Sequence, residues 1–181
     1  MKTIYLAAGC FWATEKLFAD TPGVISVVSG YANGKKEIEN PSYELVCGGM
    51  TNYKETVRVE YDESEVSLKK LLLIYFNVID PTVMSRQGAD VGTQYQTGIF
   101  YTEDDQLKTI DEIADPVREK ARQFCVLIEP FDVFYDAEEY HQKYLEKNPN
   151  GYCHISRSRL STLPTLGEEE LEQMLSEKQY F

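Results

Sequence analysis

The sequence is poor in positive charge and in histidine. Its 181 residues include 18 Lys and Arg against 30 Asp and Glu, a net charge of −12, and only 2 histidines. Such an acidic chain repels phosphate backbones and anionic membranes, and no basic stripe interrupts it. We therefore expect no nucleic acid and no membrane as partners, and we interpret the charge as a source of solubility.

Long apolar runs and paired cysteines are also missing. The apolar segment after Thr3 covers only residues 4–8, too short for a signal peptide or a membrane span, so we expect a cytoplasmic protein. In a reducing compartment the four cysteines form no structural framework, and each needs an explanation by reactivity, metal binding or burial. No Cys-x-x-Cys pair is present and the histidines lack ligand spacing, so we expect no metal site.

Hydrophobic periodicity and turn signals divide the chain into alternating strands and helices. We expect strands at 3–9, 24–31, 54–61, 98–101 and 124–128, and helices at 11–19, 67–78, 103–122, 137–147 and 168–178. Ser67 is a plausible N-cap of its helix. Because some strands follow one another too closely for crossovers, we predict an α+β fold: a two-layer sandwich around a mixed β-sheet with a ferredoxin-like core. Residues 1–181 fit one domain, with 148–181 as a C-terminal tail.

Cys10 lies where an expected buried strand ends and an expected helix begins. The first turn of a helix presents unpaired N–H groups and a partial positive charge, which stabilise a thiolate and lower the pKa of a cysteine. Gly9 leaves room for a substrate to approach the sulfur. The position alone leaves an alternative open, a buried cysteine that serves as a small hydrophobic side chain.

Glu55 is the only charged residue on one face of its expected strand. It shares that face with Val57, Val59 and Tyr61. Burying an unpaired carboxylate is costly, so we expect Glu55 to be protonated, hydrogen-bonded or paired. The alternative is a frayed strand end at which Glu55 reaches water.

An ordered series of short motifs runs from residue 9 to residue 153. The motifs are Gly9-Cys10-Phe11-Trp12, Gly30-Tyr31, Asn40-Pro41-Ser42-Tyr43, Val46-Cys47, Glu55, Asp90-Val91-Gly92-Thr93-Gln94-Tyr95, Ala137-Glu138-Glu139-Tyr140-His141-Gln142 and Asn148-Pro149-Asn150-Gly151-Tyr152-Cys153. In this order they resemble the peptide-methionine (S)-S-oxide reductases, the A-type methionine sulfoxide reductase family. One tetrapeptide would only be suggestive, whereas the ordered series is highly specific.

The resemblance implies a reaction and a role for eight residues. Methionine (S)-sulfoxide, free or in proteins, is reduced to methionine, the nucleophile becomes a sulfenic acid, and an intramolecular disulfide then forms that thioredoxin recycles. No cofactor is implied. The implied roles are nucleophile for Cys10, catalytic carboxyl for Glu55, polar pocket lining for Tyr31, Asp90 and Tyr95, resolving thiol for Cys153, and a clamp on the substrate S-methyl for Phe11 and Trp12.

Each of the supporting residues also has a structural interpretation. Tyr31 fits a half-buried strand end, Asp90 a loop cap and Tyr95 a core aromatic, while Phe11 and Trp12 fit the buried face of a helix. Two rival functions use the same thiol. A thiol peroxidase or cysteine hydrolase would turn over peroxide or an ester, and a methionine-binding or redox-sensing module would not release methionine.

We expect structural roles for the remaining cysteines and for one histidine, and three positions depart from the family pattern. Cys47 and Cys125 stand among apolar residues, and we expect them to be buried structural thiols. His141 is expected to make a structural hydrogen bond. Glycine, histidine and arginine are usual in the family at three positions that are occupied here by Ala13, Tyr53 and Gln96.

Overall fold

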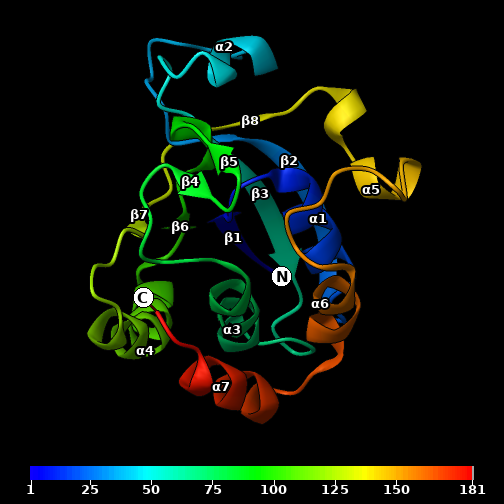
Figure 1. Ribbon diagram of the computed structural model, residues 1–181. Coiled ribbons are helices and arrows are strands. Elements are labelled where there is room, and N and C mark those ends of the chain that lie inside the picture. Colours follow the sequence, from blue (N-terminus) through cyan, green and yellow to red (C-terminus); the bar gives the residue numbers. More distant parts are fainter. Residues whose placement is uncertain (181) are drawn as a thin grey trace.

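A six-stranded mixed sheet forms the centre of the computed structural model, which describes residues 1–180 (Figure 1). The strand order is β7-β6-β1-β3-β2-β8. The strands are β1 (Lys2–Ala7), β2 (Val24–Ala32), β3 (Lys54–Tyr61), β6 (Gly98–Tyr101), β7 (Leu127–Pro130) and β8 (Phe134–Asp136). Neighbouring strands are antiparallel except β6 and β7, which are parallel. The α+β class with a mixed sheet is therefore confirmed.

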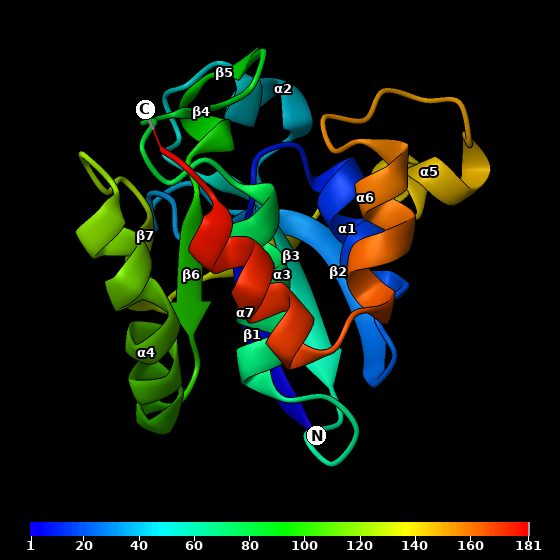
Figure 2. The same ribbon diagram turned by 60° about the horizontal axis from the view of Figure 1, so that its bottom comes forward.

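Helices connect the strands and cover one face of the sheet. In Figure 2, α7 and α3 lie in front of the strands, with α4 to one side and α6 and α1 to the other. The helices are α1 (Phe11–Ala19), α2 (Tyr43–Cys47), α3 (Leu68–Val78), α4 (Asp104–Lys120), α5 (Tyr144–Lys147), α6 (Arg157–Thr162) and α7 (Glu168–Glu177). A small second sheet pairs β4 (Arg86–Gln87) with β5 (Asp90–Val91), and a 3₁₀ turn, η1 (Thr93–Tyr95), follows it.

The main core fills the space between the sheet and the helices. Successive strand residues point to opposite faces, so Ile4 and Leu6 join this core and are fully buried. Tyr5 and Ala7 belong to a smaller cluster on the other face. A connecting loop covers that face, since the Phe131 ring stacks on Tyr5 with centroids 4.1 Å apart. From Ile4 onward, both faces of β1 are therefore shielded from water, and the burial continues to Cys10.

Most of the expected elements are present, and several have the expected bounds. The helix at 11–19 and the strands at 54–61 and 98–101 match α1, β3 and β6. The expected strand at 124–128 is shifted, because its ladder with β6 begins at the Gly98–Leu127 pair. The short elements α2, α6 and β8 were not expected, since five-, six- and three-residue segments carry little periodicity.

The expected helix at 137–147 is wrong. Only Tyr144–Lys147 forms an α-helix, after a 3₁₀ turn at Glu139–His141. Lys143 interrupts the segment with a left-handed φ of 52°, because its amide binds both carboxyl oxygens of the buried Glu15, at 2.9 and 3.0 Å. The Gln142 side chain bonds both the N–H and the C=O of Ser29, as a neighbouring strand would. Tertiary hydrogen bonds override the local helical pattern here.

The segment from residue 148 onward carries α6 and α7, which pack on the rest of the chain. Leu160, Leu163 and Leu171 are buried in the main core. The acidic helix α7 has the bounds expected within one residue, and its Glu168 side chain pairs with Lys69 of α3. The last helix thereby contributes apolar side chains to the same core as the sheet.

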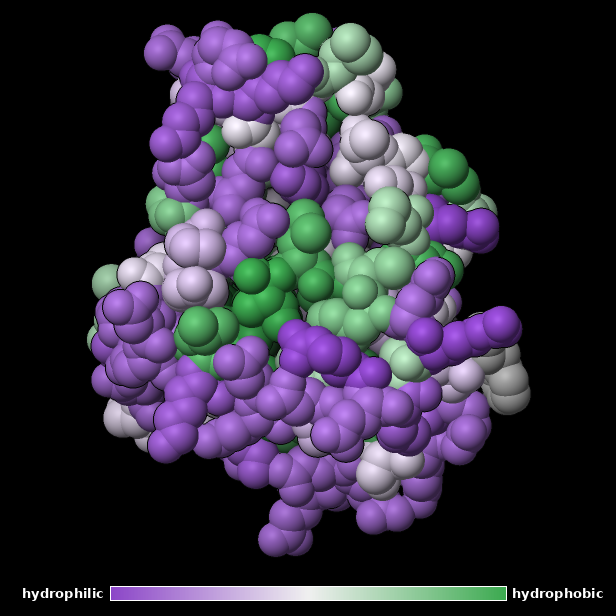
Figure 3. Space-filling model, turned by 90° about the vertical axis from the view of Figure 1, so that its left-hand side faces the viewer, coloured by the Kyte–Doolittle hydropathy of each residue, from purple (hydrophilic) through white to green (hydrophobic). Residues whose placement is uncertain are grey.

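Hydrophilic side chains dominate the surface on the side of α4 and β7, with hydrophobic ones gathered across its middle (Figure 3). Within residues 1–180, no helix combines the length and the apolar character that crossing a membrane requires.

The N-cap of α3 provides a test of the local analysis. Ser67 Oγ accepts a hydrogen bond from the Lys70 amide at 2.9 Å, as the expected cap requires. Ser67→Ala should lower the free energy of unfolding by about 1 kcal/mol, because the first-turn amide loses its partner. Urea denaturation measures the change, and Ser158→Ala, at an exposed serine, is the control. Equal stability of both variants would contradict the capping role.

Candidate active site

A sharp turn after β1 places Cys10 at the start of α1. Gly9 has a φ of 87°, and a Cβ there would lie 2.8 Å from the Gln87 Cβ and 3.4 Å from the His154 Nε2. Only glycine therefore fits this left-handed position. Cys10 occupies the N-cap position of α1 and is 6% exposed. The thiol thus lies at the strand–helix junction that the sequence indicates, between β4 and the segment that carries Cys153.

Glu55 is buried beside this junction. It is 2% exposed, and one carboxyl oxygen, Oε2, accepts a hydrogen bond from the Phe11 amide at 3.1 Å. Burial raises the pKa of Glu55 to about 8, with a smaller contribution from Asp90, while the Phe11 amide opposes the shift. The expected buried, hydrogen-bonded carboxyl is confirmed, and the frayed strand end is not observed. Near neutral pH, Glu55 carries a proton that it can donate.

The expected lowering of the Cys10 pKa is wrong for the substrate-free protein. Burial is the largest influence and raises the pKa of this thiol, and Glu55 raises it further. The amides of Trp12 and Ala13 act in the opposite direction, as a helix N-terminus should, but they are outweighed. Here the free-energy cost of desolvating a thiolate exceeds the stabilisation that the first turn of α1 provides. Cys10 is therefore a neutral thiol in the resting site.

Tyr31, Tyr95 and Asp90 surround the same two residues. Tyr31 is fully buried and lies opposite Glu55 in the β2–β3 register. Burial raises the pKa of Tyr95, and the charges of Glu55, Asp90 and Cys10 raise it further. The structure thus brings the five polar candidates together from four segments of the chain, since Asp90 and Tyr95 belong to the same one.

The two aromatic candidates have different surroundings. Phe11 is 1% exposed, and its ring centroid lies 5.8 Å from that of Tyr31. Its ring therefore belongs to the buried face of α1, which was the structural interpretation of this residue. Trp12 is half-buried and stacks on Tyr144 with centroids 3.7 Å apart. Its indole N–H donates to His141 Nδ1 at 3.0 Å, which confirms the expected structural hydrogen bond of that histidine.

The other three cysteines are free thiols. Cys153 is half-buried, and its thiol donates to its own segment, at Ile155 O, over 2.9 Å. Cys47 is exposed and Cys125 is partly exposed, so the expectation of buried structural thiols is wrong for Cys47 and too strong for Cys125. The apolar neighbours of Cys47 indicate burial, but α2 is a five-residue helix at the molecular surface that buries only Val46.

Glu138 is a contributor that the motif analysis matched without assigning a role. Its carboxylate accepts the Tyr31 hydroxyl and the Tyr43 amide, each at 2.9 Å. Burial raises the pKa of Glu138, but the hydrogen bonds from the Tyr43 amide, from its own amide and from the Tyr31 hydroxyl, with the charge of His141, lower it below its ordinary value. The carboxylate therefore fixes the orientation of Tyr31. Its place in the 137–142 motif was the available signal.

The three departures from the family pattern occupy structural positions. Ala13 is fully buried in α1. Tyr53 is also fully buried, and its hydroxyl donates to Ile38 O at 2.9 Å. The Gln96 side chain accepts from the Ser85 amide and donates to Cys125 O. Each side chain is satisfied within the fold.

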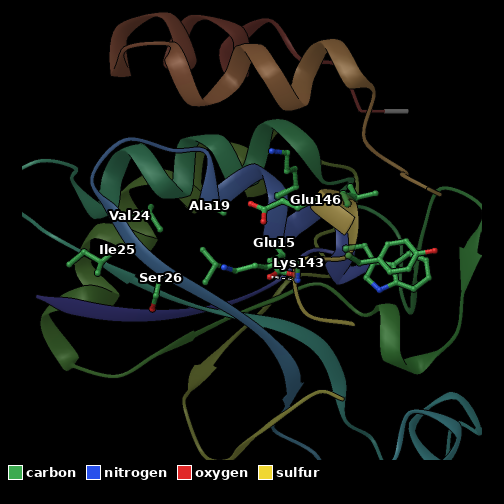
Figure 4. Close-up of a pocket in the computed structure, with 12 residues that line it drawn as sticks. Glu15, Ala19, Val24, Ile25, Ser26, Lys143 and Glu146 are labelled. Carbon is green, nitrogen blue, oxygen red and sulfur yellow. Dashed lines mark hydrogen bonds between the residues drawn. The ribbon is translucent and has the colours of Figure 1, made fainter. Parts of the chain in front are cut away.

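A separate cavity of about 250 Å³ lies beside the site (Figure 4). Trp12 and Tyr144 line one part of it, and Glu15 and Lys143 meet in its wall, joined by dashed hydrogen bonds in the figure. Cys10 is not among its lining residues. No cluster of three or more potential ligands in residues 1–180 is arranged to hold a metal ion.

Comparison with known proteins identifies the family of the chain. Residues 2–168 match the family model of peptide methionine sulfoxide reductase. The chain is 51% identical over 161 residues to the peptide methionine sulfoxide reductase MsrA of Clostridium acetobutylicum, covering 88% of this chain and 98% of that protein.

Two solved structures have the same fold. Reduced Mxr1 from Saccharomyces cerevisiae aligns with a TM-score of 0.80 and 39% identity, over 86% of this chain and 91% of that one. Methionine sulfoxide reductase A of Corynebacterium diphtheriae aligns with a TM-score of 0.78 and 38% identity, over 84% and 77%.

The family match and these relatives show that the protein is an oxidoreductase. The chain belongs to the peptide methionine sulfoxide reductase family, and it reduces methionine sulfoxide.

The raised pKa of Glu55 predicts a pH-dependent stability. Between the ordinary value of 4.5 and the folded value of about 8, unfolding releases a proton from Glu55. The free energy of unfolding therefore falls as pH rises through this window, and the fall ends above the folded pKa. Glu55→Gln should remove this part of the slope, so the variant gains stability relative to the wild type on going from pH 5 to pH 8.

Urea denaturation of both proteins at several pH values measures the difference. Glu60→Gln, on the opposite face of the same strand, is the matched control. Because Glu15 titrates in every protein compared, its contribution cancels. Parallel stability profiles for the wild type and Glu55→Gln would contradict the raised pKa.

Proposed function

We propose that this protein reduces methionine (S)-sulfoxide, free or in proteins, through a sulfenic acid on Cys10. The observation that carries the proposal is a 2%-exposed carboxyl with a pKa of about 8 next to a 6%-exposed thiol. A sulfoxide sulfur is a poor electrophile until its oxygen is protonated or strongly hydrogen-bonded. Glu55 supplies that proton near neutral pH because burial keeps it protonated.

The chemical step couples the two buried groups. When Glu55 gives its proton to the sulfoxide oxygen, the Cys10 sulfur attacks the activated sulfur, and the oxygen passes to Cys10 as methionine leaves. The proton of the Cys10 thiol replaces the one lost by Glu55, so the step balances without an external base. Tyr95 and Asp90 complete the polar wall, and Tyr31 stands opposite Glu55 with its hydroxyl held by Glu138.

The aromatic pair supports selection of one epimer. Phe11 and Trp12 directly follow the nucleophile, and a methyl next to sulfur packs favourably on aromatic rings. With the methyl held on the rings and the oxygen directed to Glu55, only one epimer presents its sulfur to Cys10. Trp12 stacks on Tyr144, and this contact fixes the orientation of the indole ring, which supports a role in holding the methyl group.

Recycling uses Cys153 and thioredoxin in this proposal. Cys153 condenses with the Cys10 sulfenic acid, and thioredoxin reduces the resulting disulfide. Mxr1 from Saccharomyces cerevisiae is known in complex with Trx2, which supports a thioredoxin-type reductant for this chain. In this proposal one intramolecular disulfide, Cys10–Cys153, is sufficient for recycling.

We also propose that residues 1–181 form one domain with a ferredoxin-like core in a two-layer sandwich. The strand order β6-β1-β3-β2, with α1 between β1 and β2 and α3 between β3 and β6, supports this topology.

The function is tested with resolved sulfoxide epimers, with dithiothreitol as reductant and methionine release as readout. The wild type should release methionine from the (S)-epimer only, and Cys10→Ser should release none, since oxygen is a far weaker nucleophile. Glu55→Gln should slow the pre-steady-state step by about 10²–10⁴-fold, because the proton donor is lost. Cys47→Ser is the matched cysteine control and should keep normal rates.

Release of methionine by Cys10→Ser would exclude this mechanism. Turnover of peroxide or an ester without methionine formation would favour a thiol peroxidase or a hydrolase. Sulfoxide binding without methionine release would favour a sensing module.

One turnover without reductant should leave a Cys10–Cys153 disulfide, with Cys47 and Cys125 free. The reason is that Cys153 lies on the segment that packs against the Cys10 turn. Peptide mapping identifies the pair. In Cys153→Ser, methionine should appear once per enzyme and a sulfenic acid should persist on Cys10. A different disulfide in the wild type would refute the assignment of Cys153.

A further inference from the structure

Two polar contacts attach the segment around Cys153 to the site, one on each side of the thiol. The Tyr152 hydroxyl donates to Asp90 Oδ1 at 3.0 Å. His154 Nε2 lies 3.1 Å from the Ala8 carbonyl oxygen. Tyr152 and His154 are the immediate neighbours of Cys153, and neither has a role in the proposed chemistry of the first step.

The acceptor determines the protonation state of His154. A carbonyl oxygen can only accept, so Nε2 carries the hydrogen and Nδ1 holds a lone pair in the neutral ring. Nδ1 is buried and has no hydrogen-bond partner among residues 1–180. Burial lowers the pKa of His154, against the opposing charge of Asp90. The imidazole is therefore neutral near pH 7, and its bond to Ala8 O is maintained.

Both contacts are close to the reacting thiols. A Cβ on Gly9 would lie 3.4 Å from His154 Nε2, so the ring packs against the residue before Cys10. Burial and the hydrogen bond to Asp90 raise the pKa of Tyr152 to about 12, and Cys10 and Cys153 both contribute to the rise. The Tyr152 hydroxyl therefore links the residue before Cys153 to Asp90.

We propose that His154 is a positioning residue for disulfide formation: its bond to Ala8 O, with the Tyr152–Asp90 bond, holds Cys153 facing the Cys10 turn. The inference rests on the proposed function and concerns its second step. In the resting state the Cys153 thiol donates to Ile155 O at 2.9 Å, so it must rotate away from its own backbone before it attacks. A tether on both sides allows this rotation without movement of the segment.

The step that His154 assists balances without a further reagent. The Cys153 sulfur attacks the sulfenic sulfur of Cys10, an S–S bond forms and the S–O bond breaks. The departing hydroxide takes the Cys153 proton and leaves as water. Cys153 is oxidised and Cys10 is reduced to the disulfide level. The tether increases the fraction of time for which the two sulfurs are within reach, and it leaves the attack on sulfoxide unchanged.

Two rates in a single turnover test the proposal. Rapid quench measures methionine release, and loss of dimedone-trappable sulfenic acid together with peptide mapping measures disulfide formation. His154→Leu keeps the bulk of the ring but removes the donor, and should slow disulfide formation about tenfold. Its methionine release should stay within about twofold of the wild type. His154→Gln, which offers an amide N–H near the Nε2 position, should restore most of the rate.

A second variant and a control complete the design. Tyr152→Phe removes the other contact and should slow the same step, so a folding defect in His154→Leu does not leave the question open. Asn150→Ala, at an exposed residue of the same segment, should change neither rate. Equal slowing of methionine release and disulfide formation in His154→Leu and Tyr152→Phe, or no slowing of either, would overturn the inference. A wild type that forms no Cys10–Cys153 disulfide would instead refute the proposed function.

Discussion

The hydrogen bond from the Phe11 amide to the Glu55 carboxyl joins the first turn of α1 to the start of β3. It holds the carboxyl one residue away from Cys10, inside a site where both groups are almost fully buried. The same burial that raises the pKa of Glu55 to about 8 keeps the carboxyl largely protonated near neutral pH. Displacing either element would separate the acid from the thiol.

As a consequence, the two central groups of the site carry little charge near neutral pH. Cys10 is a neutral thiol and Glu55 is largely a neutral acid near pH 7, so neither pays the full cost of a buried charge. In the proposed mechanism a buried cysteine with a raised pKa can still act as a nucleophile, because Glu55 accepts the Cys10 proton as it gives its own proton to the sulfoxide.

Residues far along the chain complete the site through tertiary hydrogen bonds. The buried Glu15 binds the Lys143 amide, and Gln142 binds the Ser29 backbone. These bonds position His141 and Tyr144 against Trp12. A few residues later the chain returns across the Cys10 turn. The second half of the protein therefore supplies the surroundings of a thiol, Cys10, that belongs to its first ten residues.

Local patterns in the sequence determined β3 and α1 with their bounds, the Ser67 cap and the lone charge of Glu55 on an apolar face. Such features depend on neighbours within one or two turns, and the ordered motifs added the candidate residues and the family. Tertiary structure decided the direction of the Cys10 pKa shift, the exposure of Cys47 and the left-handed Lys143. Burial and distant hydrogen bonds set these properties, and both arise from segments that meet only when the chain has folded.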